Sequence, residues 1–385
     1  MKYLYKLIFT FYFLFFTFIS RAQNTDSCHA RISVITCAPG QELYSLFGHT
    51  ALRIIDSTHN TDIVYNWGTF SFDEPNFYVK FMRGQLLYFV SAWTFPEFMY
   101  EYQQEGRSVY EQTLNLHCPD KQKIIDAVML NMQGDNRFYK YDFLLDNCTT
   151  RIRDIVLKQL PQTNFTKRTV DTGTTARNMI HYYLDRGGQP WSKLGIDILL
   201  GSKLDAPVSN MQAMFLPEFY MQAMDNAENN GMPVCEKNRT ILSALPQAKQ
   251  SGQYTPLIII GFICLMIYLL SISKSAAAKK ITAFIDVFLL CITGLLGILL
   301  LFMWFGTDHT VCKTNYNLAW ALPTNFIAGF FYFKRPSWLK KYFMLVAILS
   351  AILMAGWFWL PQQMNIALAP FAILMMLRYF KLATA

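Results

Sequence analysis

Hydrophobic residues are distributed unevenly along this chain, and their pattern divides it into three parts. A short apolar run occupies residues 7–19. From residue 23 to about 253 no apolar run is long enough to cross a bilayer, whereas long apolar runs dominate from Pro256 onwards. We therefore predict a leader, one soluble domain and one membrane domain, with boundaries at residues 1–22, 23–253 and 254–385.

The N-terminal run has the features of a secretory signal peptide. Lys2 and Lys6 flank its start, and Ser20-Arg21-Ala22 places small residues at the positions that a signal peptidase recognises. The alternative is an uncleaved N-terminal anchor. In either case we expect the domain that follows to be exported.

In the soluble part, short β-rich runs alternate with helix-like segments, which predicts an α+β domain. Residues 50–55 and 63–67 are strand-like and are separated by a polar turn, so we predict a hairpin. The other predicted elements are strands over residues 30–36, 86–90 and 108–116 and helices over residues 95–105 and 121–132.

A cysteine near the middle of the chain is the strongest candidate for chemistry. Asp146-Asn147 resembles a helix cap, and Ile152 and Val156 recur at helical spacing, so Cys148 is predicted in the first turn of a helix. Free N–H groups and the helix dipole stabilise a thiolate there and lower the pKa of a cysteine below its usual value of ~8.5. The alternative is that Cys148 belongs to a disulfide or to the core.

The predicted hairpin supplies partners for this cysteine. His49 opens its first strand and Asn66 lies on the returning strand, so both are expected near the same open end. A cysteine at a helix start, a histidine and an amide are the parts of a papain-type site, in which the imidazole moves the proton and the third residue orients the ring. His59, in the turn, competes with Asn66 for the third position.

The last third of the chain contains five apolar runs. Basic residues follow the first, third and fifth runs, and the positive-inside rule therefore places the C-terminus in the cytoplasm. The connection that holds His309 is then expected on the same side as Cys148. Asn317, Pro323 and Asn325 interrupt the third run, and Asp286 lies in the second. These polar groups are expected to face the bundle interior or a cavity, or only to join helix to helix. The predicted spans are residues 256–272, 281–305, 317–333, 342–360 and 364–377.

Composition refines this picture without changing it. The chain has 385 residues, of which 53% are hydrophobic and 16% charged, and a net charge of +8. Many of the basic residues flank apolar runs, so the charge does not indicate nucleic-acid binding. No phosphate-binding glycine loop and no Cys-x-x-Cys pair is found, and neither a cofactor nor a metal is predicted. If Cys148 is free, at most two disulfides can form among Cys28, Cys37, Cys118, Cys235 and Cys312.

The histidine precedes the cysteine in the chain, which reverses the order in papain. This order resembles circularly permuted papain-like proteins of the NlpC and lecithin:retinol acyltransferase type. Several blocks also resemble the Lnb family, both its N-terminal periplasmic domain and the transmembrane region behind it. These blocks are FGHTALR at 47–53, DNCTTRIRD at 146–154, GID at 195–197 with LG at 200–201, FLP at 215–217, TDH at 307–309 and NYNLAWALP at 315–323.

The resemblance implies a lipoprotein N-acyltransferase of the bacterial inner membrane, with its catalytic domain in the periplasm. Such an enzyme moves a fatty acyl chain from a phospholipid to the α-amine of a diacylated lipoprotein's N-terminal cysteine. Carried over, Cys148 is the nucleophile, His49 the general base and Asn66 the orienting residue.

Four further residues are candidates for substrate contact. Tyr141 could donate its hydroxyl to an oxyanion or only pack, whereas Arg53 and Arg151 could meet lipid phosphate or form surface ion pairs. His309 could reach the site from the membrane domain. The competing functions are a membrane-anchored papain-like cysteine peptidase or amidase acting on cell-wall peptides, and a receptor or scaffold in which Cys148 is disulfide-bonded.

Overall fold

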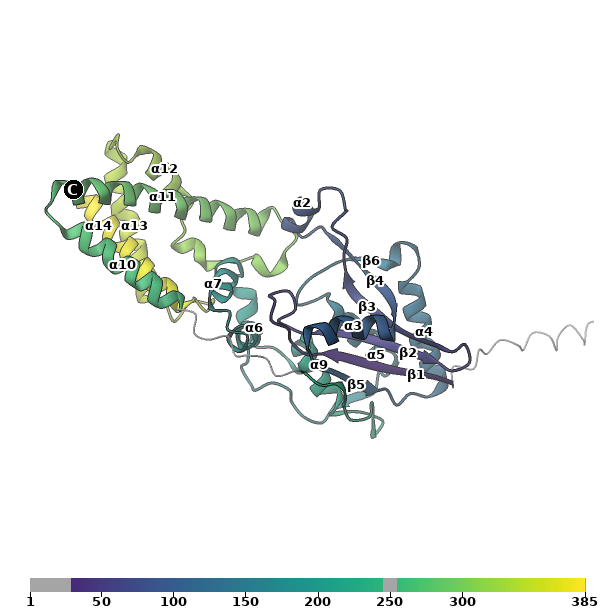
Figure 1. Cartoon of the computed structure of the whole chain (residues 1–385). Helices are drawn as coiled ribbons and strands as arrows, with labels where there is room; N and C mark the ends of the chain where they lie inside the picture. The colour runs from purple at the N-terminus through teal and green to yellow at the C-terminus, as the bar shows by residue number, and fades with distance from the viewer. Residues whose placement is uncertain (1–28, 245–254, 385) are drawn as a thin grey trace, which may run out of the picture.

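A sheet-rich domain is followed by a bundle of apolar helices in the computed structural model of the chain, which describes residues 29–244 and 255–384 (Figure 1). The predicted α+β class is therefore confirmed for the first domain. The predicted signal peptide and the predicted boundary at residue 253 lie outside the described residues.

One antiparallel sheet of seven strands forms the centre of the first domain, in the order β10-β5-β1-β2-β3-β4-β6. The predicted hairpin is confirmed, because β2 pairs with β3 and places Leu52 opposite Tyr65. The strands are β1 Ala30–Cys37, β2 His49–Asp56, β3 Thr61–Thr69, β4 Leu87–Thr94, β5 Val109–Thr113, β6 Phe138–Lys140 and β10 Arg239–Leu242. A small second sheet holds β7 Thr163–Phe165, β8 Ala227–Asn229 and β9 Met232–Pro233.

Helices cover both faces of the large sheet. Successive side chains of a strand point to opposite faces, and both faces of this sheet carry apolar side chains. On one face Leu52 of β2 packs into a core with Ile152 of α5 (Cys148–Gln159) and Val128 of α4 (Cys118–Asn131). On the other face Ala51, the neighbouring residue, packs with Phe98 of α3 (Phe95–Glu105). The remaining helices of this domain are α2 Phe77–Met82, α6 Ala176–Arg186, α7 Pro190–Leu199, α8 Asn210–Ala213 and α9 Pro217–Met224.

Within the described residues, three helical segments of the second domain are long and apolar enough to cross a membrane, namely 276–305, 337–355 and 366–384. A fourth, α10 (Pro256–Ile272), is apolar and has 17 residues. The other helices are α11 Ala276–Phe305, α12 Thr324–Phe331, α13 Ser337–Ala355 and α14 Ala369–Thr384.

The third predicted span differs from the structure. Instead of one helix over 317–333 there is a short 3-10 turn, Tyr316–Ala319, followed by the eight-residue helix α12. Pro323 stands immediately before α12, where it cannot continue a helix from the preceding residues. The chain in this region is therefore free to turn towards the first domain.

Polar side chains inside the bundle join its helices, as predicted for Asp286 and Asn325. The Asp286 carboxylate accepts hydrogen bonds from Arg378 Nε at 2.7 Å and from the Tyr332 hydroxyl at 2.8 Å. Asn325 Nδ2 donates to the Tyr379 hydroxyl at 2.8 Å. The sequence placed Arg378 after the last span, whereas it lies buried within α14, where Asp286 neutralises it.

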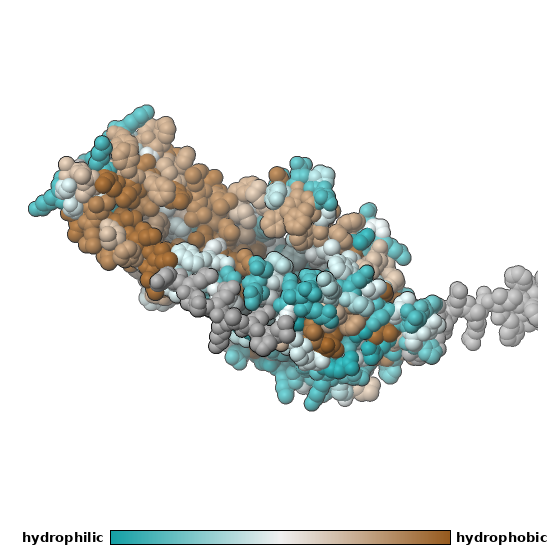
Figure 2. Space-filling model, viewed as in Figure 1, coloured by the Kyte–Doolittle hydropathy of each residue, from teal (hydrophilic) through white to brown (hydrophobic). Residues whose placement is uncertain are grey.

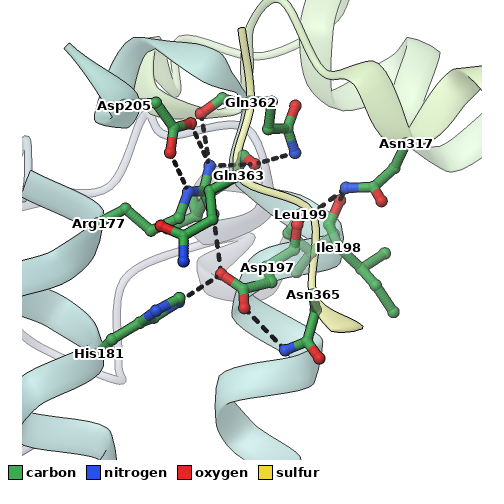
Figure 3. A network of polar contacts seen from close by, with 12 residues as sticks. Arg177, His181, Asp197, Ile198, Leu199, Asp205, Asn317, Gln362, Gln363 and Asn365 are labelled. Carbon is green, nitrogen blue, oxygen red and sulfur yellow. Dashed lines mark hydrogen bonds and ion pairs between the residues drawn. The ribbon is translucent and has the colours of Figure 1, made fainter. Parts of the chain in front are cut away.

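The two domains are joined at the C-terminal end of α7. The last carbonyl groups of a helix have no partner within the helix. Here the side-chain amides of Asn315 and Asn317, from the second domain, donate to the carbonyls of residues 197–199 at 2.8–3.1 Å. Gln362 donates to the carbonyl of Leu200 at 3.1 Å. The second domain therefore completes the hydrogen bonding of a helix in the first (Figure 3).

A buried carboxylate lies at the centre of this junction. Asp197 accepts hydrogen bonds from Arg177, His181 and Asn365, each at 2.8 Å (Figure 3). Burial alone would raise the pKa of Asp197, but the hydrogen bond from His181 and the positive charges nearby outweigh it and hold the pKa below its usual range. The carboxylate is thus held by two segments: α6, which carries Arg177 and His181, and the connection of the membrane domain that carries Asn365.

Gly201 is the point of closest backbone approach at this junction. Its N–H donates to the carbonyl of Val311 at 2.9 Å, and a Cβ at this position would lie 2.0 Å from the carbonyl oxygen of Lys313. We expect Gly201→Ala to destabilise the chain by roughly 1–3 kcal/mol or more, because two backbones must separate. Gly195→Ala, in α7, is the control, since no atom lies within 4 Å of its added Cβ.

Thermal unfolding of the two purified variants measures this difference. A lower melting temperature for Gly201→Ala, with Gly195→Ala unchanged or slightly raised, is the expected pattern. Equal stability of the two variants would show that the junction is looser than the hydrogen bonds indicate.

Candidate active site

Cys148 is the first residue of α5, as the cap motif predicted. Asn147 caps the helix, because its side chain accepts a hydrogen bond from the N–H of Thr150 at 2.9 Å while the Thr150 hydroxyl accepts one from the N–H of Asn147 at 2.8 Å. The Asn147 amide also donates to the carbonyls of Phe143 and Phe215 at 2.8 and 2.9 Å. The chain on both sides of the cysteine is therefore fixed in position.

The Cys148 thiol is free, so the alternative in which it forms a disulfide is wrong. Cys37, Cys235 and Cys312 are free and buried, whereas Cys118 is disulfide-bonded. The cysteine at the helix start is thus available for chemistry.

The start of β2 lies against this cysteine. The His49 ring and the backbone N–H of Thr50 lie close enough to the Cys148 sulfur to lower the pKa of its thiol. The hydroxyls of Thr50 and Thr149 are 3.0 Å apart and tie the strand to the helix. The structure thus brings together the two residues that the sequence singled out at positions 49 and 148.

Asn66 occupies the third position. Its side-chain oxygen accepts a hydrogen bond from Nε2 of His49, across the β2–β3 hairpin. His59, the competitor, is exposed in the turn and bonds through Nδ1 to the carboxylate of Asp56 at 2.6 Å. The geometry therefore favours Asn66 as the residue that orients the ring.

The Cys148 thiol and the His49 imidazole shift each other's pKa. Burial alone would raise the pKa of Cys148, but the adjacent His49 and the hydrogen bonds from His49 and Thr50 outweigh burial and lower it to about 7. Burial would lower the pKa of His49, but the charge of Cys148 and the hydrogen bonds to Cys148 and Asn66 raise it. Near neutral pH this arrangement favours a thiolate beside an imidazolium.

Tyr141 lies close to the cysteine. It packs against the same core as Cys148, its ring stacks on that of Tyr88 with centroids 4.7 Å apart, and the Cys148 charge contributes to raising its pKa well above the usual value. Burial is the main cause of that shift. Tyr141 is therefore a neutral aromatic wall of the site.

The two arginines proposed for lipid phosphate have other partners. Arg53 is buried, forms ion pairs with Asp62 at 2.6 Å and Glu111 at 3.0 Å, and lies over the ring of Phe95. Arg151 pairs with Asp146 at 2.6 Å and lies over the ring of Tyr139. These surroundings favour structural roles for both.

His309 lies between the two domains. Its Nε2 bonds to the carbonyl of Phe81 at 3.2 Å, and the neighbouring Asp308 pairs with Lys140 at 2.8 Å. Thr310 donates to the carboxylate of Asp142, a few residues before the cysteine, at 2.6 Å. The connection after α11 therefore contacts the segment that leads to Cys148, while the His309 ring itself bonds to the last turn of α2.

Two residues of the site were not predicted from the sequence. The hydroxyls of Thr50 and Thr149 hydrogen-bond to each other, and the Thr149 hydroxyl also contacts the thiol. The only sequence signal for them was their position next to the histidine and the cysteine.

A thiol, an imidazole and an amide thus lie together on a domain joined to apolar helices, and these are the groups that cysteine-dependent enzymes use. Two family models match the chain: the Lnb N-terminal periplasmic domain over residues 20–181 and the Lnb transmembrane domain over residues 247–385. The chain therefore belongs to the Lnb family, as the sequence motifs predicted, and is an inner-membrane protein with a periplasmic domain. No curated protein and no solved structure matches it.

Proposed function

We propose that this protein is a lipoprotein N-acyltransferase that uses Cys148 as its nucleophile, His49 as the general base and acid, and Asn66 as the orienting residue. The observation that carries the proposal is the position of Cys148 beside His49, whose ring is hydrogen-bonded to Asn66, on a domain that is docked to membrane helices. Family membership supports a lipoprotein-processing membrane enzyme.

The first half-reaction transfers an acyl group to sulfur. The Cys148 thiolate attacks the ester carbonyl carbon of a phospholipid and forms a tetrahedral oxyanion. The N–H groups of Cys148 and Thr149, which precede the Thr150 N–H that Asn147 caps, are suited to stabilise that oxyanion. As the carbon–oxygen bond breaks, the His49 imidazolium gives its proton to the departing oxygen, which leaves a lysophospholipid and a thioester on Cys148.

The second half-reaction transfers the acyl group to nitrogen. The neutral α-amine of a lipoprotein's diacylglyceryl-cysteine attacks the thioester carbonyl, and the neutral His49 ring takes a proton from the nitrogen. The carbon–sulfur bond then breaks, which forms the amide and restores the thiolate beside the imidazolium. Both substrates reside in the membrane, so an enzyme fixed at the bilayer meets them at high effective concentration.

Two further parts of the proposal concern architecture. The order of His49 before Cys148, on a strand and at a helix start, supports a permuted papain-like arrangement of the NlpC and lecithin:retinol acyltransferase type. The lysines after α10, Lys274, Lys279 and Lys280, support a cytoplasmic connection there. A cytoplasmic C-terminus follows if all five apolar segments cross the bilayer.

The mass of the intermediate separates this proposal from the peptidase alternative. We expect the purified full chain, incubated with vesicles of dipalmitoyl phospholipid and no amine acceptor, to gain one palmitoyl group on the peptide that contains Cys148. Hydroxylamine should remove it, because thioesters are labile to that nucleophile. Intact-protein and peptide mass spectrometry measure the change.

Cys148→Ser is the matched control, because an oxygen ester would resist mild hydroxylamine. A peptidyl mass on Cys148 after incubation with cell-wall peptides, without an acyl mass from the vesicles, would instead identify the peptidase. No adduct in either case would contradict the nucleophilic role of the cysteine.

A further inference from the structure

Helix α2 (Phe77–Met82) has a composition that its surroundings do not explain. Five of its six residues are aromatic or aliphatic, yet none of the six is buried. Tyr78 is 77% exposed and Phe81 52%, and Phe72, in the preceding loop, is 71% exposed. Large apolar side chains gathered at one surface in this way mark a binding site for apolar material.

This apolar surface is continuous with the membrane domain. The backbone N–H of Asp308, directly after the connection from α11, donates to the carbonyl of Arg83 at 2.8 Å, and His309 bonds to the carbonyl of Phe81. Figure 1 shows the end of α11 beside α2, and Figure 2 shows apolar surface at this place as well as along the membrane helices.

The length of α11 brings this contact to the bilayer surface. Its 30 residues span about 45 Å, whereas the hydrocarbon core is about 30 Å thick. Its last residue, Phe305, is 75% exposed. The helix therefore extends from the bilayer to α2 with an apolar surface along its course.

A series of aromatic rings leads from α2 to the cysteine. The ring of Phe72 lies 5.1 Å from that of Phe70, Phe70 lies 5.3 Å from Tyr88, and Tyr88 lies 4.7 Å from Tyr141, each measured between centroids. Tyr141 and Cys148 pack against the same core. The series thus joins an exposed apolar surface at the membrane to the candidate nucleophile.

We propose that α2 and the loop before it bind the fatty acyl chain of a bilayer phospholipid and that the aromatic series from Phe72 to Tyr141 guides the chain to Cys148. This inference rests on the proposed acyl transfer for its purpose, but acyl-chain binding at α2 can be measured separately. A polar peptide is not expected to use this surface, because its backbone groups would be left without partners among apolar rings.

Lipid contact is tested without catalysis. The full-length Cys148→Ala variant is placed in vesicles of phosphatidylcholine that contain a trace of phospholipid with a photoreactive diazirine on its acyl chain. After illumination, peptides that cover residues 70–83 should carry the lipid label, as should peptides from the membrane spans. Labelled spans with no label on residues 70–83 would overturn the proposal.

Guidance of the acyl chain to Cys148 is tested by substituting only residues whose side chains are exposed. The double variant Phe72→Ser and Tyr78→Ser should form the Cys148 thioester from vesicle phospholipid at least tenfold more slowly than the parent. The control is Tyr100→Ser and Leu130→Ser, on α3 and α4, which are 62% and 55% exposed. Alkylation of Cys148 by iodoacetamide, a small water-soluble reagent, should be equal in all three proteins.

The two proposals fail differently. If the parent forms no thioester, acyl transfer is wrong and the photolabelling result alone decides whether α2 binds lipid. If the parent forms the thioester and the Phe72/Tyr78 variant forms it equally fast, guidance by α2 is wrong although acyl transfer stands.

Discussion

Replacing Cys148 with alanine is expected to reduce lipoprotein N-acylation by at least about 10³-fold, because no other group at the site can form the acyl intermediate. The neighbouring polar side chains are His49 and the threonines at 50 and 149, whose hydroxyls bond to each other. A neutral hydroxyl is a far weaker nucleophile than a thiolate, so these threonines would not replace the cysteine. Mass spectrometry of lipoprotein N-termini, in cells whose chromosomal copy is replaced by each variant, measures the loss.

Cys235→Ala is the matched control for this prediction. Burial raises the pKa of Cys235 to about 12, so its thiol stays protonated, and its sulfur donates to the carbonyl of Met224 inside the core. This variant should keep N-acylation near the parental level. Wild-type N-acylation by the Cys148→Ala protein, at equal abundance in the membrane, would remove the thioester mechanism.

The second large effect is expected from His49→Ala, which changes the ionisation of the Cys148 thiol. In the parent, alkylation of Cys148 by iodoacetamide should rise with pH through a midpoint of about 7, since only the thiolate reacts. Without His49 the main cause that lowers the pKa is gone, and burial moves the midpoint to the ordinary value of 9.0 or above. At pH 7 the ionised fraction then falls from about one half to about 1% or less, a roughly 50-fold loss of alkylation rate in His49→Ala.

The other described thiols of the first domain provide an internal reference. Burial raises the pKa of Cys37 and of Cys235 to about 12, so peptides that contain them should stay unlabelled at neutral pH in both proteins. Asn66→Ala should give an intermediate shift, because it removes one hydrogen bond from the ring and leaves the ring in place. A parental midpoint near 9 would show that His49 and Cys148 do not form the charged pair.

Local chemistry made much of the site predictable. The cap formed by Asn147 requires only residues within one helical turn, and the hairpin that carries His49 and Asn66 requires only a polar turn between two strand-like runs. The helix over residues 95–105 was predicted with the bounds that α3 has, and in the structure Thr94 and Glu97 form a capping box at its start.

Long-range pairing was not predictable from the sequence. Asp197 and Asn365 are 168 positions apart, and nothing near either residue indicates that a carboxylate of the first domain accepts a hydrogen bond from the membrane domain. Hydropathy predicted a continuous third span because it averages over many residues. A single proline barely changes that average, although Pro323 prevents the helix from continuing through this point. Hydropathy also treated Arg378 as a flanking charge, since its partner Asp286 lies on another helix.

The docking of α7 onto the membrane domain has a consequence for which bonds the enzyme can reach. Side-chain amides of Asn315, Asn317 and Gln362 bond to the helix end directly, so hydrogen bonds fix the first domain to the membrane domain. Under the proposed acyl transfer, Cys148 would then act at one depth, and only esters and amines that reach this depth could meet the sulfur. Depth in the membrane would then contribute to substrate specificity, because chemically similar esters and amines at another depth would not be used.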